Sequence, residues 1–400
     1  MTSEWENVRL GDIVELNYGR ALTATNRVDG NIPVYSSAGL TGWHNTPLVD
    51  SKGIVIGRKG TVGKVYKSEI PFFTIDTAYY VLPNDEIYDF NFMYYLLSSL
   101  GLEELNEDSA IPGLNRNTAY AQEFDLPPVS IQKKIAHILS TLDDKIELNS
   151  KMNQTLEEMA QALFKSWFVD FDPVHAKNNA TNDADYEQIA KELGISRKVL
   201  DLFPDKFEES GLGMIPTGWE VKKFGDIVIP KKGKSITKKT IIEGDVPVVA
   251  GGLTPAYYHN QFNVEAPVIT ISASGANAGF VNLYNTNIWA SDCSYINSTN
   301  SDYVLTHYIY LRLKQSEITW MQQGAAQPHI YPSHLMRLDI VDAGTKIWDD
   351  FENLLTLMFK KIAINKTEAQ TLQKIRDTLL PKLLSGELDV SELELDNVTH

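Results

Sequence analysis

Two stretches of the chain repeat apolar residues with the seven-residue period of a coiled coil. The first stretch runs over residues 130–170 and the second over residues 345–386. The pattern predicts two long helices that pair along an apolar seam. The a and d positions are Ile135, Ile138, Leu142, Met152, Leu156, Met159 and Leu163 in the first stretch, and Phe351, Leu354, Met358, Leu372, Ile375 and Leu379 in the second.

Local signals mark the ends of these helices. Ser130 is a natural N-cap, Pro173 is expected to stop the first helix, and Gly386 suits the C-terminal end of the second. Asn149 and Asn365 share one a position, where a polar residue fixes register at a cost in stability. If the helices pair antiparallel, the two asparagines should lie close together; otherwise each faces solvent at the edge of the seam. The residues predicted to pair the helices are Ile138, Leu142, Asn149, Leu156, Leu163, Leu354, Met358, Asn365, Leu372 and Leu379.

The residues ahead of each long helix show a mixed pattern of short strands, turns and helices. The β-branched runs 53–57 and 267–271 are bounded by glycine or proline and predict strands. Turn-rich stretches follow them at 57–63 and 272–279, and a helix is expected near 90–105. Each half of the chain is therefore predicted to be a mixed α/β domain followed by one long helix.

The two halves are diverged copies of one unit. Trp5-Glu6 and Gly11-Asp12-Ile13 return 214 residues later as Trp219-Glu220 and Gly225-Asp226-Ile227. Later in each copy the shift is 216 residues, as from Asn149 to Asn365. A shift that drifts this slowly indicates duplication. Two similar but different faces suit an asymmetric target in two parts.

The predicted fold class is α+β, with two similar mixed domains and two long helices that form an antiparallel coiled coil about a pseudo-two-fold axis. The segment after the first helix has no counterpart after the second, is polar around residues 178–185, and has a short helix expected near 186–193. It is interpreted as a linker. The predicted boundaries are domain 1–129, helix 130–170, linker 171–215, domain 216–344, helix 345–386 and tail 387–400.

The net charge of −16 argues against a protein that coats DNA without regard to sequence. The charge is uneven, because residues 1–130 hold nine Lys or Arg against seventeen Asp or Glu, whereas residues 211–345 hold ten of each. The acidity favours a protein that works inside a larger complex whose other subunits supply positive surface. A local basic cluster is formed by Lys231, Lys232, Lys234, Lys238 and Lys239.

Compartment signals favour the cytoplasm. No run of about 18 apolar residues is present, which is the length a membrane-spanning helix needs. The first residues lack the basic and apolar regions of a secretory signal. The single cysteine, Cys293, excludes a disulfide framework within the chain and a cysteine-rich zinc site.

Several signatures of enzymes are incomplete. Gly233-Lys234-Ser235 resembles the end of a phosphate-binding loop, but its first glycine would have to be residue 228, which is Val228. Asp143-Asp144-Lys145 lies in the heptad helix, where a solvated charged face is the simpler interpretation. His329 and His334 have no acidic or cysteine partner, which argues against a metal site. The chain is predicted to be non-catalytic, with no cofactor or metal of its own.

Polar, glycine-rich loops at matching places in both halves carry the candidate DNA contacts. Glycines allow close approach to a phosphate backbone, and Arg, Lys or Asn side chains can read base edges in the major groove. The plain alternative is an ordinary turn with solvated cations. The candidate residues are Arg20, Arg27, Tyr35, Ser36, Arg58, Lys59, Thr61, Lys64, Asn115 and Arg116 in the first half, and Lys231, Lys232, Lys234, Lys238, Lys239, Ser272, Ser274, Asn277, His329 and Tyr331 in the second.

The order and spacing of several short motifs resemble the specificity subunit of type I restriction–modification systems over essentially the whole chain. The matching stretches are Trp5 with Leu10-Gly-Asp-Ile13, Ile111-Pro-Gly-Leu-Asn115, Phe124-Asp-Leu-Pro-Pro-Val129, Leu142-Asp-Asp-Lys-Ile146, Trp167-Phe-Val-Asp-Phe-Asp-Pro173, Leu202-Phe-Pro-Asp205 and Gly213-Met-Ile-Pro-Thr-Gly-Trp219. Where the family has Glu-Gln after the Pro-Pro pair, this chain has Ile131-Gln132.

The resemblance implies two target-recognition domains that each read half of a split sequence in double-stranded DNA. It implies an antiparallel coiled coil that sets the unread spacer, and two modification subunits that bind S-adenosylmethionine and methylate adenine N6. Two ATP-dependent restriction subunits can join such a complex. The expected function is a non-catalytic reader of a bipartite DNA target that also serves as a scaffold.

Two other classes of protein stay open on sequence alone. An enzyme with duplicated methyltransferase or nuclease domains is disfavoured, because Leu126-Pro-Pro-Val129 lacks the polar first residue and the aromatic residue of the amino-methyltransferase motif. A duplicated coiled-coil interaction scaffold that never meets DNA is the main alternative, and the acidic charge favours it.

Overall fold

The structure is a computed structural model that describes residues 5–105, 113–298, 305–315 and 329–394. The chain forms two compact units: unit 1 is Met1–Asn149 together with Glu368–His400, and unit 2 is Ser150–Thr367. Both boundaries cut through the long helices, so each unit contains part of each helix. The predicted domain boundaries instead keep the helices whole.

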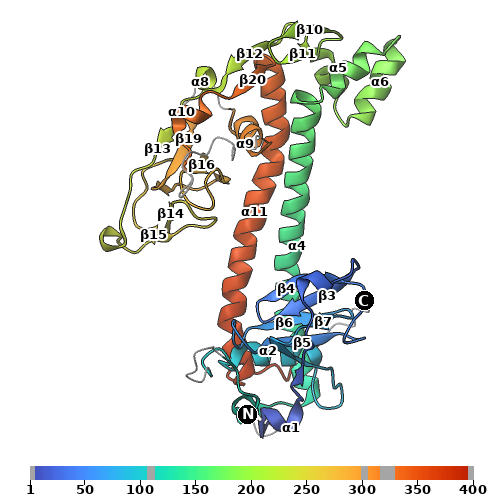
Figure 1. The fold of residues 1–400 in the computed structure, drawn as a ribbon, viewed down its shortest axis with the longest axis vertical. Helices are drawn as coiled ribbons and strands as arrows, with labels where there is room; N and C mark the ends of the chain where they lie inside the picture. The colour runs from blue at the N-terminus through green and yellow to red at the C-terminus, as the bar shows by residue number, and fades with distance from the viewer. Residues whose placement is uncertain (1–4, 106–112, 299–304, 316–328, 395–400) are drawn as a thin grey trace. The chain divides into compact units, whose positions relative to one another are not determined.

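The strands of unit 1 are β1 (Glu6–Arg9), β2 (Asn17–Tyr18), β3 (Ile32–Ser36), β4 (Gly39–His44), β5 (Gly53–Gly57), β6 (Val65–Ser68), β7 (Phe73–Thr74), β8 (Ala78–Val81) and β9 (Glu123–Leu126). The main sheet is antiparallel in the order β2-β8-β5-β6, and a smaller sheet has the order β4-β3-β7; β1 and β9 form a two-stranded ribbon. Figure 1 labels β3 to β7. β5 matches the predicted strand 53–57 and is buried throughout, because its Ile-Val-Ile run is covered on both faces.

The helices of unit 1 are α1 (Leu10–Ile13), the 3-10 turn η1 (Ala24–Asn26), α2 (Phe90–Ser99), α3 (Arg116–Tyr120) and portions of α4 (Val129–Phe168) and α11 (Thr345–Leu384). α2 is shorter than the predicted helix at 90–105, because Gly101 takes a φ of +65° that a right-handed helix does not continue through. The core joins Phe92 of α2, Leu139 of α4 and Leu383 of α11.

The strands of unit 2 are β10 (Phe207–Ser210), β11 (Gly213–Pro216), β12 (Glu220–Lys223), β13 (Lys231–Lys232), β14 (Val246–Val249), β15 (Tyr257–His259), β16 (Val268–Ser272), β17 (Val281–Tyr284), β18 (Trp289–Ala290), β19 (Cys293–Asn297) and β20 (Asp339–Asp342). The sheet orders β13-β19-β16-β17 and β15-β14-β18, with the β12-β20 ribbon, repeat those of unit 1 strand for strand. β14 even pairs with β18 in parallel, as β3 does with β7. The duplication seen in sequence is therefore a duplication of topology.

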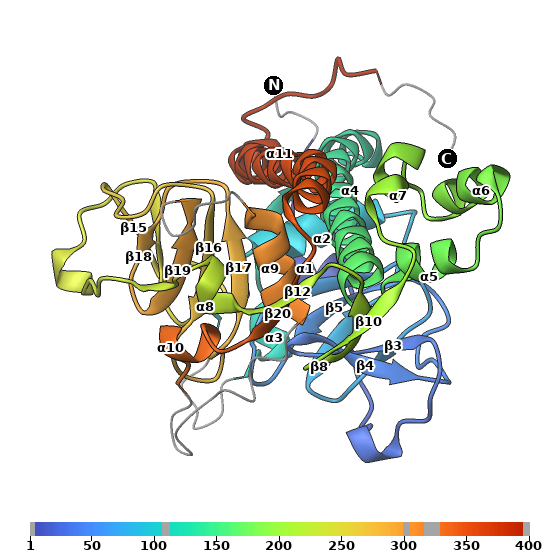
Figure 2. The same cartoon turned by 90° about the horizontal axis from the view of Figure 1, so that it is seen from above.

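The helices of unit 2 include α8 (Phe224–Ile227), the 3-10 turn η2 (Lys238–Thr240), α9 (Thr306–Gln315) and α10 (Pro332–Leu335). Viewed from above, α9 lies beside the sheet at β17 and next to α11 (Figure 2). Aromatic rings from three helices pack together in the core. The ring centroids of Trp167 in α4 and Phe351 in α11 lie 5.3 Å apart, and those of Phe168 in α4 and Tyr308 in α9 lie 4.9 Å apart.

The segment expected as a linker is folded. It holds α5 (Asp172–Asn178), α6 (Asp183–Glu192), α7 (Arg197–Leu202) and the β10-β11 hairpin. Val174 and Phe203 join the core of unit 2, and Asn182 with Asp185 forms a capping box that starts α6 inside the polar run. The prediction that Pro173 stops the first helix is wrong: α4 ends at Phe168, and Pro173 lies in the first turn of α5, where its missing N–H costs no hydrogen bond.

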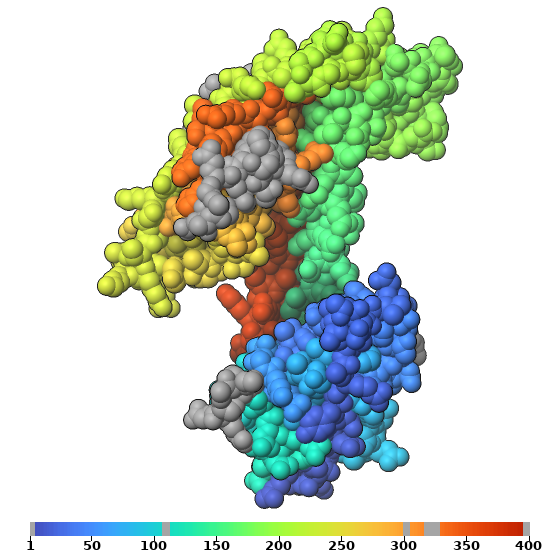
Figure 3. Space-filling view, in the orientation of Figure 1, coloured from blue at the N-terminus to red at the C-terminus, as the bar shows by residue number. Residues whose placement is uncertain are grey.

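The two long helices have 40 residues each and run antiparallel within each unit. In unit 1 Arg376 donates to Asp143, and Asn149 donates to Glu368. In unit 2 Asn365 donates to Asn153, and Phe164 contacts Phe351. In both units a rising residue number on α4 meets a falling number on α11. The green surface of α4 and the red surface of α11 touch directly in the space-filling view (Figure 3).

The seam contains most of the predicted pairing residues at half-buried positions. Leu354 is different, since it is 38 % exposed whereas Leu355 is fully buried. Each helix also packs a second apolar face against a domain, so its most buried residues lie beside the seam. The half-buried apolar residues are Ile138, Leu142, Leu156, Leu163, Met358, Leu372 and Leu379.

The two seam asparagines are fully buried, and each donates its amide to the opposite helix. Asn149 Nδ2 lies 2.9 Å from Glu368 Oε2 in unit 1, and Asn365 Nδ2 lies 2.9 Å from Asn153 Oδ1 in unit 2. Within the described residues, the Oδ1 atoms of Asn149 and Asn365 are buried without a hydrogen-bond partner. Each of these side-chain amides therefore donates to another residue of the opposite helix, and not to the other asparagine.

Replacing Asn149 or Asn365 by Leu should raise the stability of the folded chain. A buried polar atom without a partner costs about 1–3 kcal/mol, which Leu removes at the expense of one amide hydrogen bond. We expect a higher urea midpoint for each variant, followed by circular dichroism. Asn353→Leu, on an exposed position of α11, is the matched control and should change little. A lower midpoint for the seam variants would show that the amide hydrogen bonds outweigh the orphaned oxygens.

Candidate nucleic-acid interface

The main sheet of unit 1 brings three strand ends to one edge. β2 ends at Tyr18 opposite Tyr79, and β5 ends at Gly57 opposite Ala78, so both ends flank the start of β8. The amides of Arg58 and Lys59 then donate to Thr77 O at 2.9 and 3.0 Å. The glycine-rich loop that sequence analysis selected is thus anchored at this edge.

A second loop joins the same edge from a distant part of the chain. Lys59 forms a β-bridge with Gly113, and Leu114 N donates to Arg58 O at 2.8 Å. Gly63 closes the loop with a φ of +74°, and a Cβ there would lie 2.3 Å from the backbone of Leu102. The close approach explains why the loop carries glycine at this position.

Two arginines from these loops stack on one exposed tyrosine. The Cζ atom of Arg58 lies 4.9 Å from the ring centroid of Tyr18, and that of Arg116 lies 5.3 Å from the same ring. Tyr18 is 50 % exposed and also packs edge to face on Tyr79. Both contacts are within the range of cation–π attraction. The sequence pattern predicts both arginines as DNA contacts but not Tyr18, although an aromatic residue just before Gly19-Arg20 is a signal that the sequence contains.

Other candidates in the first domain have structural partners. Lys64 forms an ion pair with Glu103 at 2.7 Å, and the hydrogen bond and charge of Glu103 raise the pKa of Lys64. Arg27 donates to Thr41 O, and Asn115 caps α3 by accepting from Asn117 N. Tyr35 and Ser36 lie on β3 and donate to backbone carbonyls at Lys67 and Gly39, while Arg20 and Thr61 are exposed.

Unit 2 has the same backbone arrangement with different side chains. We call this arrangement of the strand ends and the two bridged loops the frame: the first frame contains the Lys59–Gly113 bridge and the second contains the Ser274–His329 bridge. Ser274 forms a β-bridge with His329, and Ile330 N donates to Ala273 O at 2.9 Å, as in the corresponding contacts of unit 1. By position in this frame, Ala273 stands where the first copy has Arg58. Lys232, at the end of β13, matches Tyr18, and Pro332 matches Arg116.

The second frame presents hydroxyl, imidazole and phenol groups. Ser274 Oγ donates to Asp292 at 2.7 Å, and the ring of Tyr331 stacks on His329 with centroids 6.0 Å apart. Tyr331 is 47 % exposed. Ser272 and Asn277 instead hold the loop together, since both donate to Gly251 O.

The predicted lysine cluster of unit 2 is exposed. In the described parts of the chain none of these lysines forms an ion pair with a carboxylate; they are Lys231, Lys232, Lys234, Lys238 and Lys239. Their charge is available to an anionic partner. The start of each second loop, residues 111–112 and 327–328, lies outside the described residues.

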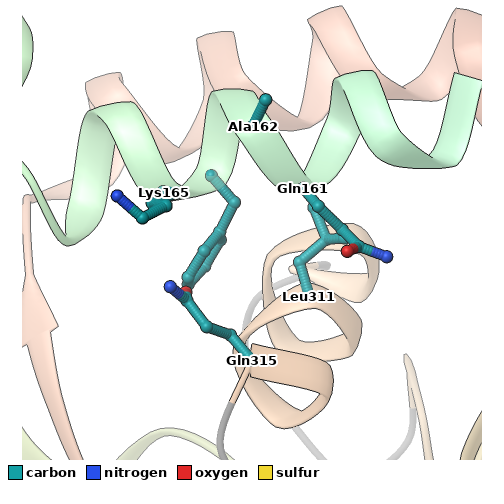
Figure 4. Close-up of a pocket in the computed structure, with 6 residues that line it drawn as sticks. Gln161, Ala162, Lys165, Leu311 and Gln315 are labelled. Carbon is teal, nitrogen blue, oxygen red and sulfur yellow. The ribbon is translucent and has the colours of Figure 1, made fainter. Parts of the chain in front are cut away.

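The described residues do not assemble a metal site. Among them, no group of three or more His, Cys, Asp or Glu side chains is placed to hold a metal ion. Glu352 accepts from the amides of His307 and Tyr308, so its carboxylate caps α9. A shallow cavity of about 280 Å³ between α4 and α9 is lined by Gln161, Ala162, Phe164, Lys165, Leu311 and Gln315, and lacks converging charged groups (Figure 4). No helix in the described ranges is both long and apolar enough to cross a membrane.

Comparison with known proteins decides the family. Residues 2–158 and 216–373, more than half of the chain, match the model of the type I restriction modification DNA specificity domain. The chain belongs to this family. The assignment confirms the predicted resemblance, and the two matched regions and the long helices α4 and α11 confirm the predicted fold of two mixed domains, each followed by a helix.

Curated relatives of this specificity chain span most of its length. It is 29 % identical over 384 residues to the type I restriction enzyme HindI specificity subunit of Haemophilus influenzae, covering 80 % of this chain and 82 % of that protein. It is 28 % identical over 371 residues to the MjaIX specificity subunit of Methanocaldococcus jannaschii, covering 85 % and 78 %. These are subunits without catalytic activity of their own, as predicted for this chain.

A solved structure supports the fold. The S subunit of a type I restriction–modification system from M. genitalium superposes with a TM-score of 0.63 over 95 % of this chain and 96 % of that one, at 19 % identity. At that identity the likeness bears on the fold alone. Specificity subunits of type I systems function with DNA and with methyltransferase and restriction subunits.

Cys293 should be unreactive in the folded chain. The thiol is buried, and burial raises its pKa from 9.0 to about 12, so the thiolate fraction near pH 8 is roughly 1,000-fold lower than for an ordinary cysteine. We expect a thiol-reactive chromogenic disulfide to label the native chain at pH 8 far more slowly than the chain unfolded in guanidinium. Labelling at equal rates in both states would contradict the buried position.

Proposed function

We propose that this specificity chain reads a bipartite sequence in double-stranded DNA, with residues 1–129 contacting one half-site and residues 216–344 the other. One observation supports the proposal most directly. The two copies share a frame, with the β-bridge Lys59–Gly113 in one and Ser274–His329 in the other, but present different side chains on it. A common frame with different chemistry suits two half-sites of different sequence.

The proposed contacts include residues of both frames and their flanks. Arg58, Lys59 and Arg116 lie together in the first frame, while Ser274, His329 and Tyr331 lie together in the second. The remaining proposed residues are Arg20, Arg27, Tyr35, Ser36, Thr61, Lys64, Asn115, Lys231, Lys232, Lys234, Lys238, Lys239, Ser272 and Asn277. Of these, seven have structural partners that compete with DNA contact: Arg27, Tyr35, Ser36, Lys64, Asn115, Ser272 and Asn277.

We propose partner subunits that would supply the catalytic chemistry. Two modification subunits would bind S-adenosylmethionine and methylate adenine N6, and two restriction subunits would supply ATP-dependent cleavage where the system includes them. The net charge of −16 supports work inside such an assembly, since an isolated acidic chain is repelled by DNA phosphates. Because DNA is the target, we propose the cytoplasm as the place of action. An interaction scaffold without DNA recognition is not favoured by the family assignment.

The decisive test is sequencing of methylated adenines in cells that express this chain with its modification subunit. We expect a new methylated motif in two specified parts separated by unspecified bases, and no such motif in cells that lack the chain. Co-purification of the subunits is the control for assembly. An assembled complex that adds no motif would contradict the proposed reader and would favour an interaction scaffold.

We propose that the length of the two long helices sets the distance between the two recognition domains and so the length of the unread spacer. We call this the ruler model. Inserting four residues into α4 after Asn149 and four into α11 after Thr367 adds about 6 Å at 1.5 Å per residue and rotates each helical face by only about 40°. DNA rises about 3.4 Å per base pair, so the unread spacer should grow by roughly one or two base pairs with both half-sites unchanged. A methylated motif with its original spacer would contradict the ruler model. Insertion into one helix alone is the control and should disturb assembly.

A further inference from the structure

Two arginine side chains lie close together at the edge of the main sheet of unit 1. Within the described residues, neither Arg58 nor Arg116 forms an ion pair, although the chain holds 52 Asp or Glu against 36 Lys or Arg. Two other arginines of unit 1 are paired, since Arg9 contacts Glu123 and Arg376 contacts Asp143. Arg58 and Arg116 are thus two guanidinium groups that have no carboxylate partner among the described residues and that meet on the ring of Tyr18.

The stack on Tyr18 holds both guanidinium planes ready for a ligand. Arg58 lies between Tyr18 and Tyr79, at 4.9 and 5.7 Å from their centroids, and donates one N–H to Asp76 O at 3.1 Å. Arg116 lies between Tyr18 and Tyr120, at 5.3 and 5.8 Å. Tyr79 and Tyr120 are themselves anchored, because Tyr79 donates to Leu114 O and Tyr120 accepts from Leu16 N. Ordering the guanidinium groups before binding lowers the entropy cost of recognition.

The surroundings favour a base edge over a phosphate as the ligand. Asp76, whose carbonyl holds Arg58, carries an exposed carboxylate on the same turn, and that charge repels a phosphate. A fixed planar fork matches the O6 and N7 acceptors of guanine, for which Arg is the commonest partner in the major groove. Exposed Lys59 and Arg20, which are not held by such stacking, suit phosphate contact better.

We propose that Arg58 and Arg116 read guanine in the half-site of the first domain, with Tyr18 as the residue that positions both. The inference rests on the proposed function and adds base identity to it. The second frame carries Ala273, Lys232 and Pro332 at the three equivalent places. It therefore has no matching fork, and the second half-site does not use guanine in this way.

The test uses the assembled complex of this chain with its modification subunits, and the methylated motif is the readout. Arg58→Ala and Arg116→Ala should each relax one guanine in the same half-site and leave the other half-site unchanged. Discrimination at that base should fall by roughly 5- to 150-fold, the contribution of one bidentate pair, as measured by competition between oligonucleotides that differ at that base. Arg9→Ala, which removes an arginine from the separate β1-β9 ribbon, is the matched control and should keep the motif.

Tyrosine and lysine variants separate base reading from phosphate binding. Tyr18→Ala should relax the same guanines, whereas Tyr18→Phe, which keeps the ring, should not. Arg58→Lys keeps the charge without the fork and should also relax its guanine. A different pair of results would show that Arg58 binds a phosphate. In that case Arg58→Lys keeps the motif, whereas Arg58→Ala only weakens binding and lowers the slope of log affinity against log salt concentration by about one unit. These results would overturn the inference.

Different results would contradict the proposed function and the assignment of guanine to Arg58 and Arg116. A wild-type complex that yields no bipartite motif removes the proposed function itself. A bipartite motif without guanine in the half-site altered by first-domain variants overturns only the inference. Should Arg58→Ala prevent assembly, Tyr18→Ala and Arg58→Lys still decide between base reading and phosphate binding.

Discussion

Burial of two faces on each long helix is the constraint on which the rest of the molecule depends. A helix of 40 residues with an apolar seam and a second apolar face needs cover from its partner helix and from a domain. α4 supplies Leu139 to the core of unit 1 and Trp167 to the core of unit 2. The same helix is therefore part of both cores.

That constraint also fixes the recognition frames. Each main sheet packs on helices that belong to the long pair or lie against it, so the strand ends keep one geometry in both copies. The bridges Lys59–Gly113 and Ser274–His329 are the result. Because the frame depends on buried residues and the contacts depend on exposed ones, the two faces can differ in chemistry while the backbone stays the same.

Electrostatics then separates the two faces. The first offers two guanidinium groups stacked on Tyr18, while the second offers a Ser274–Asp292 hydrogen bond beside stacked His329 and Tyr331. Both arginines are half-buried and are supported by aromatic rings, which attract the guanidinium charge. Their arrangement suits a ligand that is read by hydrogen bonds more than one that is attracted by net charge.

The sequence by itself determined the duplication, both long helices, the central strand 53–57 and the family, because periodicity and repeated motifs are local signals. It predicted Arg58 and Arg116 but not Tyr18. The contact of Tyr18 with Arg58 depends on the strand order β2-β8-β5, which joins distant residues. Only the tertiary structure decided that Leu355 is buried in place of Leu354, and that Asn149 and Asn365 donate to Glu368 and Asn153. Heptad spacing identifies an apolar stripe, but the angle at which a domain covers the helix selects which residues of that stripe are enclosed.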